Sequence, residues 1–163
     1  MAMFHAMRRS KQKLSLKECE DILFCGSSGV LALAGDDGYP YAVPISYAYD
    51  GDCIYFHCAK AGHKLDAIRR NNKASFCVVA QDLVVPEEYT SYFRSVIAFG
   101  KVTFIEEPDE KRRALRILAE KYSAEFLEGA EKEIEDKLSA VCIFCLEIEH
   151  LSGKEAIEFA EAR

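Results

Sequence analysis

The sequence predicts a mainly β fold with α (α+β): a six-stranded antiparallel barrel with flanking helices. Six short apolar segments have the length and composition of strands. Asp- and Gly-rich turns at residues 36–38 and 50–52 separate the first three segments at hairpin spacing. No repeat, low-complexity tract or linker divides the 163 residues. We therefore expect a single domain over residues 1–163.

The chain begins with a basic tail, residues 1–13, which we expect to be solvated. Ser15 and Glu18 then form a capping box, and apolar residues at helical spacing follow them. The sequence Gly-Ser-Ser-Gly at residues 26–29 ends this first helix. A second helical pattern covers residues 62–71, with Leu65 and Ile68 on its apolar side.

The six predicted strands cover residues 30–34, 41–49, 53–58, 74–80, 95–105 and 141–148. Pro44 lies inside the second strand, where the missing N–H indicates an edge, a bulge or the approach of a ligand. Residues 81–92 are predicted to be a loop. We expect a helical insertion at residues 106–138 between strands five and six, and a short helix near residues 153–162.

Charge and cysteine content exclude several classes of protein. The net charge of −6 argues against nucleic acid as a partner, and no apolar run is long enough to cross a membrane. Residues 106–137 hold 11 acidic against 7 basic residues, which predicts a solvated helical face. Seven cysteines, mostly within apolar runs, predict reduced core thiols in a cytoplasmic protein.

The segment His-Cys-Ala-Lys-Ala-Gly-His-Lys at residues 57–64 carries the strongest chemical signal. It predicts a strand end, a glycine turn and a helix start, where free N–H groups and the helix dipole favour an anion. Lys64 would add a positive charge to a phosphate there, or else be a solvated side chain. The segment lacks the first glycine and the hydroxyl of a Walker motif.

Other site types find less support in the sequence. Cys53, His57, Cys58 and His63 lie close together but alternate between strand faces and lack paired Cys-x2-Cys knuckles, so we expect no metal site. Cys142 and Cys145 face opposite ways in a strand. The strand segment Tyr-Ala-Val-Pro-Ile-Ser-Tyr, residues 41–47, is either core or a surface for a planar ring.

Four motifs in order resemble a known family. Val-Pro-Ile-Ser-Tyr, Ile-Tyr-Phe-His-Cys-Ala, Gly-His-Lys-Leu and Arg-Ser-Val-Ile-Ala-Phe-Gly-Lys-Val resemble the FMN-binding split barrel. This is the pyridoxamine 5'-phosphate oxidase-like superfamily, and the similarity favours its nitroimidazole-resistance (Nim-type) branch. It covers about residues 7–150.

The resemblance implies a homodimer with FMN at the subunit interface, and a flavin oxidoreductase that passes electrons from NADH or NADPH to a small, nitroaromatic acceptor. The alternative is a non-enzymatic protein that binds FMN or haem. The Glu-rich tail lacks the substrate-gripping residues of the vitamin-B6 oxidases. The resemblance assigns these residues to cofactor binding: Val43, Pro44, Ile45, Ser46 and Tyr47 beside the ring and ribityl chain, His57 and Cys58 by the ribityl or phosphate, His63 and Lys64 at the phosphate, and Ser95 from the partner subunit.

Overall fold

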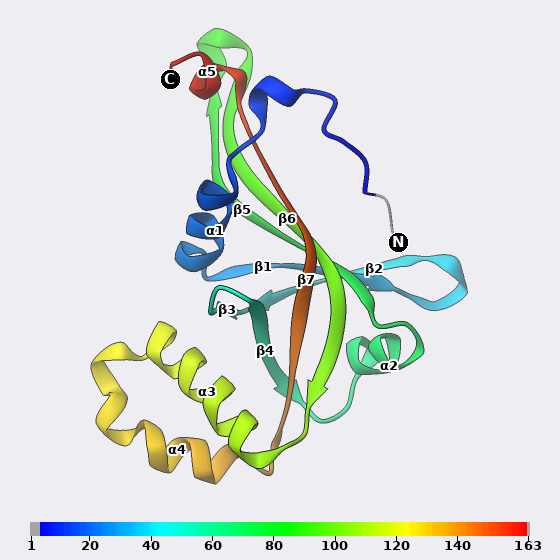
Figure 1. Cartoon of the computed structure of the whole chain (residues 1–163), viewed down its shortest axis with the longest axis vertical. Helices are drawn as coiled ribbons and strands as arrows, with labels where there is room; N and C mark the ends of the chain where they lie inside the picture. The colour runs from blue at the N-terminus through cyan, green and yellow to red at the C-terminus, as the bar shows by residue number, and fades with distance from the viewer. Residues whose placement is uncertain (1–3, 163) are drawn as a thin grey trace.

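The computed structural model describes residues 4–162 and contains one antiparallel seven-stranded sheet with five α-helices (Figure 1). The strands run in the order β2-β1-β5-β6-β7-β4-β3. Their bounds are β1 Ser28–Ala34, β2 Pro40–Ser46, β3 Ala48–Tyr49, β4 Cys53–Ala59, β5 Lys73–Val85, β6 Thr90–Ile105 and β7 Val141–Glu155.

The strand order shows that the sheet closes on itself. β2 and β3 stand at opposite ends of the order, yet Tyr47 alone separates them in the chain. Seven strands laid flat would put these edges roughly 29 Å apart, at a spacing of about 4.8 Å per strand. The two Cα–Cα steps from Ser46 to Ala48 span only about 7 Å. The sheet must therefore curl into a barrel, which is split where β2 and β4 have no ladder within residues 4–162.

The predicted strand 41–49 is two strands, so the predicted count of six is wrong. The break occurs at Tyr47, whose side chain is fully buried and whose hydroxyl donates to the Leu23 carbonyl at 2.8 Å. The Tyr47 N–H donates to the Tyr122 hydroxyl at 3.0 Å instead of to a neighbouring strand. After the break the chain pairs with β4 rather than β1. A contact from a distant helix thus decides where the strand divides.

Two more predictions fail near the end of the sheet shown at the top of Figure 1. The predicted loop 81–92 is mostly strand, because β5 continues to Val85 and β6 begins at Thr90. Asp82, Leu83 and Val84 are exposed in succession, so this end of β5 carries no alternating pattern of burial. The predicted helix at residues 153–162 begins only at Ile157, since β7 extends to Glu155.

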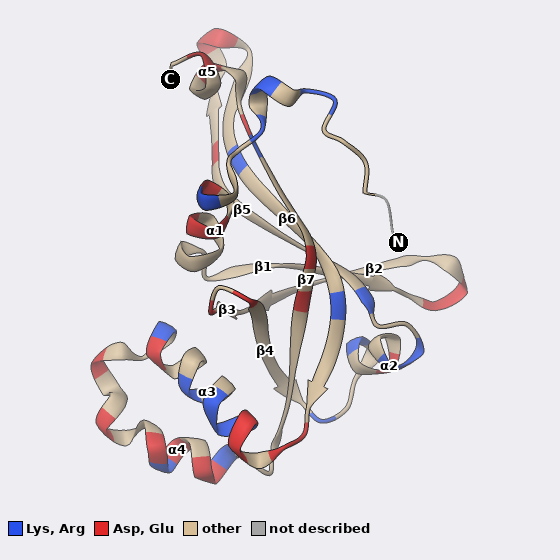
Figure 2. Cartoon of the chain, viewed as in Figure 1, with Lys and Arg blue, Asp and Glu red and all other residues tan. Residues whose placement is uncertain are grey.

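The predicted helices otherwise form close to their expected places. Their bounds are α1 Leu16–Cys25, α2 His63–Arg70, α3 Pro108–Tyr122, α4 Ala130–Lys137 and α5 Ile157–Glu161. The capping box is confirmed, with the Ser15 N–H donating to the Glu18 carboxylate at 2.7 Å and the Glu18 N–H to the Ser15 hydroxyl at 3.3 Å. The predicted insertion appears as α3 and α4 beside the barrel, with charged residues of both signs (Figure 2).

Two apolar clusters hold the barrel and the insertion together. The larger one fills the barrel and centres on the fully buried rings of Phe56, Phe76 and Phe144. The smaller one lies under α3, where Ala114 meets Tyr55 and Ile143. Cys142 packs against the first cluster and Cys145 belongs to the second, which confirms that these residues face opposite ways. All seven cysteines are free, and Cys25 is exposed.

The described part of the basic tail is docked on the sheet, although its cationic side chains are exposed as expected. Phe4 stacks on His150 with 4.6 Å between ring centroids. The buried Gln12 side chain donates to the Glu155 carbonyl at 2.8 Å. Residues 1–3 of the predicted tail and Arg163 lie outside the described residues. Among the helices of residues 4–162, none is long and apolar enough to cross a membrane.

Candidate functional site

β2 presents its residues alternately to the core and to the outside. Val43 and Ile45 pack against the core, whereas Pro44 and Ser46 are exposed. Tyr47 is fully buried, and its N–H and carbonyl both bond to the Tyr122 hydroxyl. Of the five residues predicted here, only Pro44 and Ser46 therefore direct exposed side chains outward.

Ser46 and His57 line the same pocket, although one lies on β2 and the other on β4. The pocket measures 610 Å³, a volume typical of small-molecule sites. Its other walls come mainly from the insertion, with Leu115, Leu118, Phe126 and Ile134 among its apolar residues. The structure thus joins two predicted residues to a region for which the sequence predicted only a solvated face.

His57 is the histidine that lines this pocket. Partial burial lowers the pKa of its imidazole, and the positive charge of Lys137 lowers it further. The ring is therefore neutral at pH 7. Lys137, also in the pocket wall, pairs with Glu133 at 2.8 Å. A neutral imidazole beside a hydroxyl and an apolar wall can hydrogen-bond a flat, uncharged ring system.

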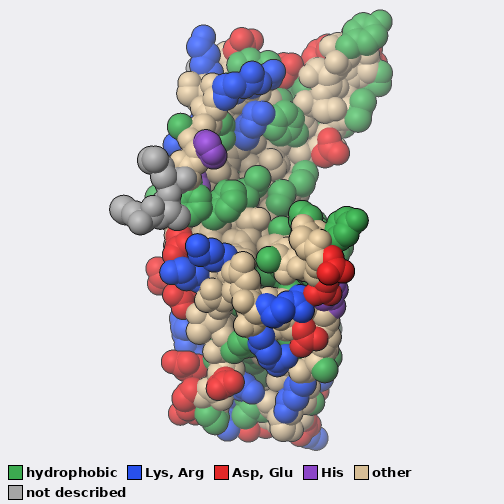
Figure 3. Space-filling view, turned by 90° about the vertical axis from the view of Figure 1, so that its right-hand side faces the viewer, with side chains coloured by type: hydrophobic (Ala, Val, Ile, Leu, Met, Phe, Trp, Pro, Cys, Tyr) green, Lys and Arg blue, Asp and Glu red, His purple; other side chains and the backbone are tan. Residues whose placement is uncertain are grey.

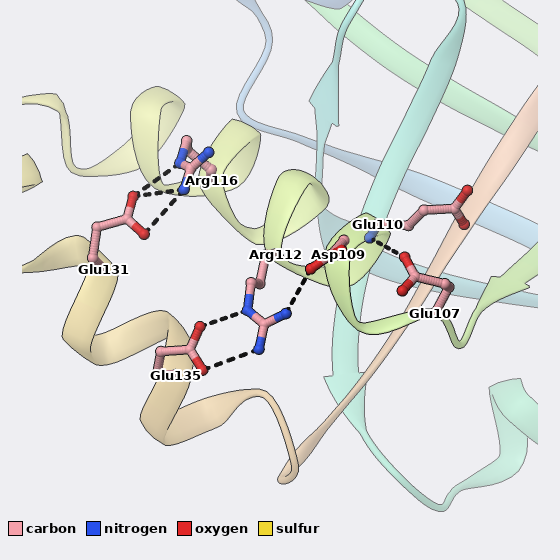
Figure 4. Close-up of polar contacts among 7 residues, drawn as sticks. All are labelled: Glu107, Asp109, Glu110, Arg112, Arg116, Glu131 and Glu135. Carbon is pink, nitrogen blue, oxygen red and sulfur yellow. Dashed lines mark hydrogen bonds and ion pairs between the residues drawn. The ribbon is translucent and has the colours of Figure 1, made fainter.

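Ion pairs between α3 and α4 fix the outer wall of the pocket (Figure 4). Arg116 binds Glu131 at 2.8 Å, and Arg112 binds Glu135 at 2.6 Å and Asp109 at 2.8 Å. Each arginine offers two nitrogen atoms to its α4 carboxylate, the geometry in which such pairs are strongest. These contacts hold α4 against α3 over the edge of the barrel.

Tyr122 anchors the end of α3 at the split in the barrel. Its hydroxyl accepts from the Tyr47 N–H and lies within hydrogen-bond distance of the carbonyls of Ser27 and Tyr47, which share its one proton. It also lines the pocket. Sequence analysis missed this residue because an exposed tyrosine at a helix end carries no local signal of such a contact.

We expect Tyr122→Phe to lower the free energy of unfolding by about 1 kcal/mol, since the hydroxyl serves backbone groups that water replaces only in part. Urea denaturation measures this change. Tyr39→Phe is the matched control, because Tyr39 is 76% exposed and makes no hydrogen bond through its hydroxyl within residues 4–162. Equal midpoints for the two variants would contradict the anchoring role.

The start of α2 forms a second, more polar part of the candidate site. Gly62 precedes the helix with φ of 144°, a conformation that favours glycine. His63 stacks on Tyr41 with 4.0 Å between centroids and pairs with Asp36 at 3.3 Å. Asp36 also binds Arg70, so one carboxylate ties α2 to the β1–β2 turn. Within the described residues, Lys64 makes no hydrogen bond or ion pair.

Two predicted residues lie apart from this arrangement. Cys58 faces Cys142 and the barrel interior, on the opposite side of β4 from His57. Ser95 lies on β6 between Val79 and Lys154, in the half of the sheet that points away from α2 (Figure 1). Among residues 4–162, no three His, Cys, Asp or Glu side chains gather in a way that could hold a metal ion.

Comparison with known proteins places this fold in a family. Residues 15–155 match the sequence model of the family described as pyridoxamine 5'-phosphate oxidase, and the chain belongs to that family. This confirms the superfamily predicted from the four motifs.

Three solved structures are similar over most of the chain. A candidate 5-nitroimidazole antibiotic resistance protein of Bacteroides thetaiotaomicron is 24% identical with a TM-score of 0.74, over 88% of this chain and 86% of that one. An FAD-binding protein of Mesorhizobium loti is 26% identical with a TM-score of 0.65, over 89% and 97%. An FAD- and heme-binding protein of Mycobacterium smegmatis is 27% identical with a TM-score of 0.72, over 93% and 80%.

Proposed function

We propose that the protein is a flavin-dependent oxidoreductase that binds FMN and passes electrons from NADH or NADPH to a small acceptor of the nitroaromatic kind. One observation carries the proposal. An apolar pocket large enough for a ring system is lined by His57 near the C-terminal end of β4, and the cationic start of α2 follows that same end of the strand. FMN has these two parts, a flat ring and an anionic phosphate. Two similar structures are described as FAD-binding proteins.

The phosphate is assigned to the start of α2. Free N–H groups of a first helical turn favour an anion, and Gly62 leaves space there because a Cβ at this position would meet nothing within 4 Å. Lys64 is available because no acidic partner holds it within the described residues. His63 is held by Asp36 and Tyr41, so its imidazole borders the anion with a fixed orientation.

The ring is assigned to the outer face of β2 and the pocket beside it. Pro44 gives this face a position without an N–H, and Ser46 and the neutral His57 offer hydrogen-bonding groups. A bound flavin supplies hydride and electron transfer, which the protein's side chains cannot perform. Leu115, Leu118 and Phe126 would exclude water from the acceptor and hold it flat.

We further propose a homodimer in which the partner subunit covers the flavin and contributes Ser95. The β5–β6 hairpin exposes Val79, Leu83, Val84 and Tyr89, and Tyr89 is 99% exposed. Figure 3 shows hydrophobic side chains gathered on this upper part of the molecule. Exposed apolar groups in such number favour an interface between protein chains. Sedimentation equilibrium should give the mass of two chains, and a single-chain mass would contradict this assembly.

The visible absorption spectrum of the freshly purified protein tests the function. We expect flavin bands, with FMN released on denaturation, and bleaching on anaerobic titration with NADH or NADPH. Protein that is colourless and does not bind added FMN contradicts the proposal. Protein that binds FMN but is reduced by neither nucleotide supports the alternative, a non-enzymatic FMN- or haem-binding protein. The similarity to an FAD- and heme-binding protein favours a parallel test with haem.

A further inference from the structure

Cys58 and Cys142 lie directly opposite each other on β4 and β7. Directly opposite residues of an antiparallel pair have Cα atoms about 4.5 or 5.5 Å apart, depending on the hydrogen-bonding site. Both separations fall in the range that disulfides span, about 4.4–6.8 Å. The Cys58 thiol donates to the Ala59 carbonyl at 3.2 Å, and the Cys58 and Cys142 thiols are close enough to shift each other's pKa. The backbone is therefore already placed for a bond between the two sulfur atoms.

The same two strands carry a second pair of cysteines, which are not directly opposite each other. Cys53 stands opposite Glu147, and Cys145 stands opposite Tyr55, so these two cysteines are diagonal neighbours. Diagonal Cα atoms are about 7–8 Å apart, beyond the usual disulfide range. This second pair lies in the same sheet, is also half-buried or buried, and has thiols that likewise shift each other's pKa, so it differs from the first pair in its diagonal backbone placement, which disfavours a bridge.

Cys142 also lines a small pocket with an excess of positive charge. The pocket has a volume of 220 Å³, and Lys60, Arg69 and Lys111 outnumber the single carboxylate of Glu106. Burial raises the pKa of the Cys142 thiol above its ordinary value, and the positive charges of Arg69 and Lys111 offset part of this rise. Within the described residues, Lys60 and Lys111 form no ion pair. The pocket therefore attracts an anionic reagent to Cys142, the thiol of the pair that lines it.

We propose that Cys58 and Cys142 form a redox-active dithiol, oxidised by anionic low-molecular-weight disulfides that enter the basic pocket beside Cys142. The Cys142 thiolate attacks one sulfur of the disulfide, forms a mixed disulfide and releases the first small thiolate. The Cys58 thiolate then attacks the Cys142 sulfur and releases the second. The two protons of the cysteine thiols pass to the two leaving thiolates. The protein loses two electrons and the small disulfide gains them, with no need for a bound flavin.

The first experiment locates the bond. Reduced protein, carrying Cys25→Ser to remove the exposed thiol, is incubated with oxidised glutathione and digested for mass spectrometry. We expect a loss of two thiols and a peptide that links residues 58 and 142. Cys145→Ser should form the same bond at the same rate, whereas Cys142→Ser should not. A link between Cys53 and Cys145, or a stable glutathione adduct that leaves the Cys58 thiol free, overturns the proposal.

The second experiment tests the basic pocket. Anionic oxidised glutathione and cationic cystamine are compared on the same protein, with the loss of thiols as the readout. Lys111→Gln should slow the reaction with oxidised glutathione about fivefold and leave cystamine no slower, because one attractive charge is lost. Lys132→Gln, on the exposed face of α4, is the control and should change neither rate. Equal effects of the two variants overturn the assignment of this pocket.

Discussion

Phe56→Ala is expected to lower the free energy of unfolding by about 3–5 kcal/mol. The Phe56 side chain is fully buried at the centre of the barrel. Its ring lies 5.1 Å from Phe76, edge to face, and 5.0 Å from Phe144, stacked. Removing it takes away the ring contacts and leaves a cavity that strands on both sides cannot fill by small shifts. Equilibrium urea denaturation, followed by circular dichroism, measures the loss.

Two further variants serve as controls for the loss of stability expected from Phe56→Ala. Phe126→Ala removes the same ring from a site that is 74% exposed, and its effect should stay within about 0.5 kcal/mol. Phe56→Leu keeps most of the volume and should cost about 1–1.5 kcal/mol, which provides a measurement if the alanine variant does not fold. A loss below about 1 kcal/mol for Phe56→Ala would show that this ring does not hold the barrel together.

Lys64→Ala should weaken FMN binding about tenfold or more, since a hydrogen bond between charged groups contributes about 1.5–3 kcal/mol. The reason is the position of Lys64 in the first turn of α2, where no acidic group within the described residues competes for its ammonium. Riboflavin, which lacks the phosphate, should bind the variant as it binds the parent protein. Titration followed by quenching of flavin fluorescence gives both affinities.

The comparison of FMN with riboflavin separates the outcomes. Lys132→Ala is the control, because Lys132 is exposed on α4, away from α2. Equal weakening of FMN and riboflavin by Lys64→Ala would indicate a disturbed fold rather than a lost phosphate contact. Unchanged FMN affinity would mean that Lys64 is only a solvated side chain, the alternative that the sequence left open.

The sequence was most informative where the signal was local. The capping box at Ser15 and Glu18 placed the first helix, and short apolar segments bounded by turn residues placed the strands. Prediction failed on residues 81–92, because the largely exposed outer end of β5 carries no periodic apolar pattern. It failed again at Tyr47, because the strand breaks through a hydroxyl that comes from Tyr122, 75 residues away.

The candidate site also has one part that local sequence predicted and one part that only the fold assembles. The helix start at Gly62–Lys64 follows from residue types and spacing within one short segment. The pocket beside Ser46 and His57 does not, because half of its wall comes from α3 and α4. The insertion contains an acidic excess, so its sequence predicted a solvated face. Its apolar residues gain a role only when the ion pairs of Arg112 and Arg116 fold α4 against α3.

By itself the sequence determined the barrel class, the family and the cationic helix start, since each depends on residues that are neighbours in the chain. The tertiary structure alone decided that Ser46 and His57 share a pocket and that Cys58 faces Cys142. It also decided that Ser95 lies apart from the pocket and from the start of α2. The physical reason is barrel closure. Curling the sheet brings β2 beside β4, and strand register selects which side chains meet; neither is encoded in any short segment.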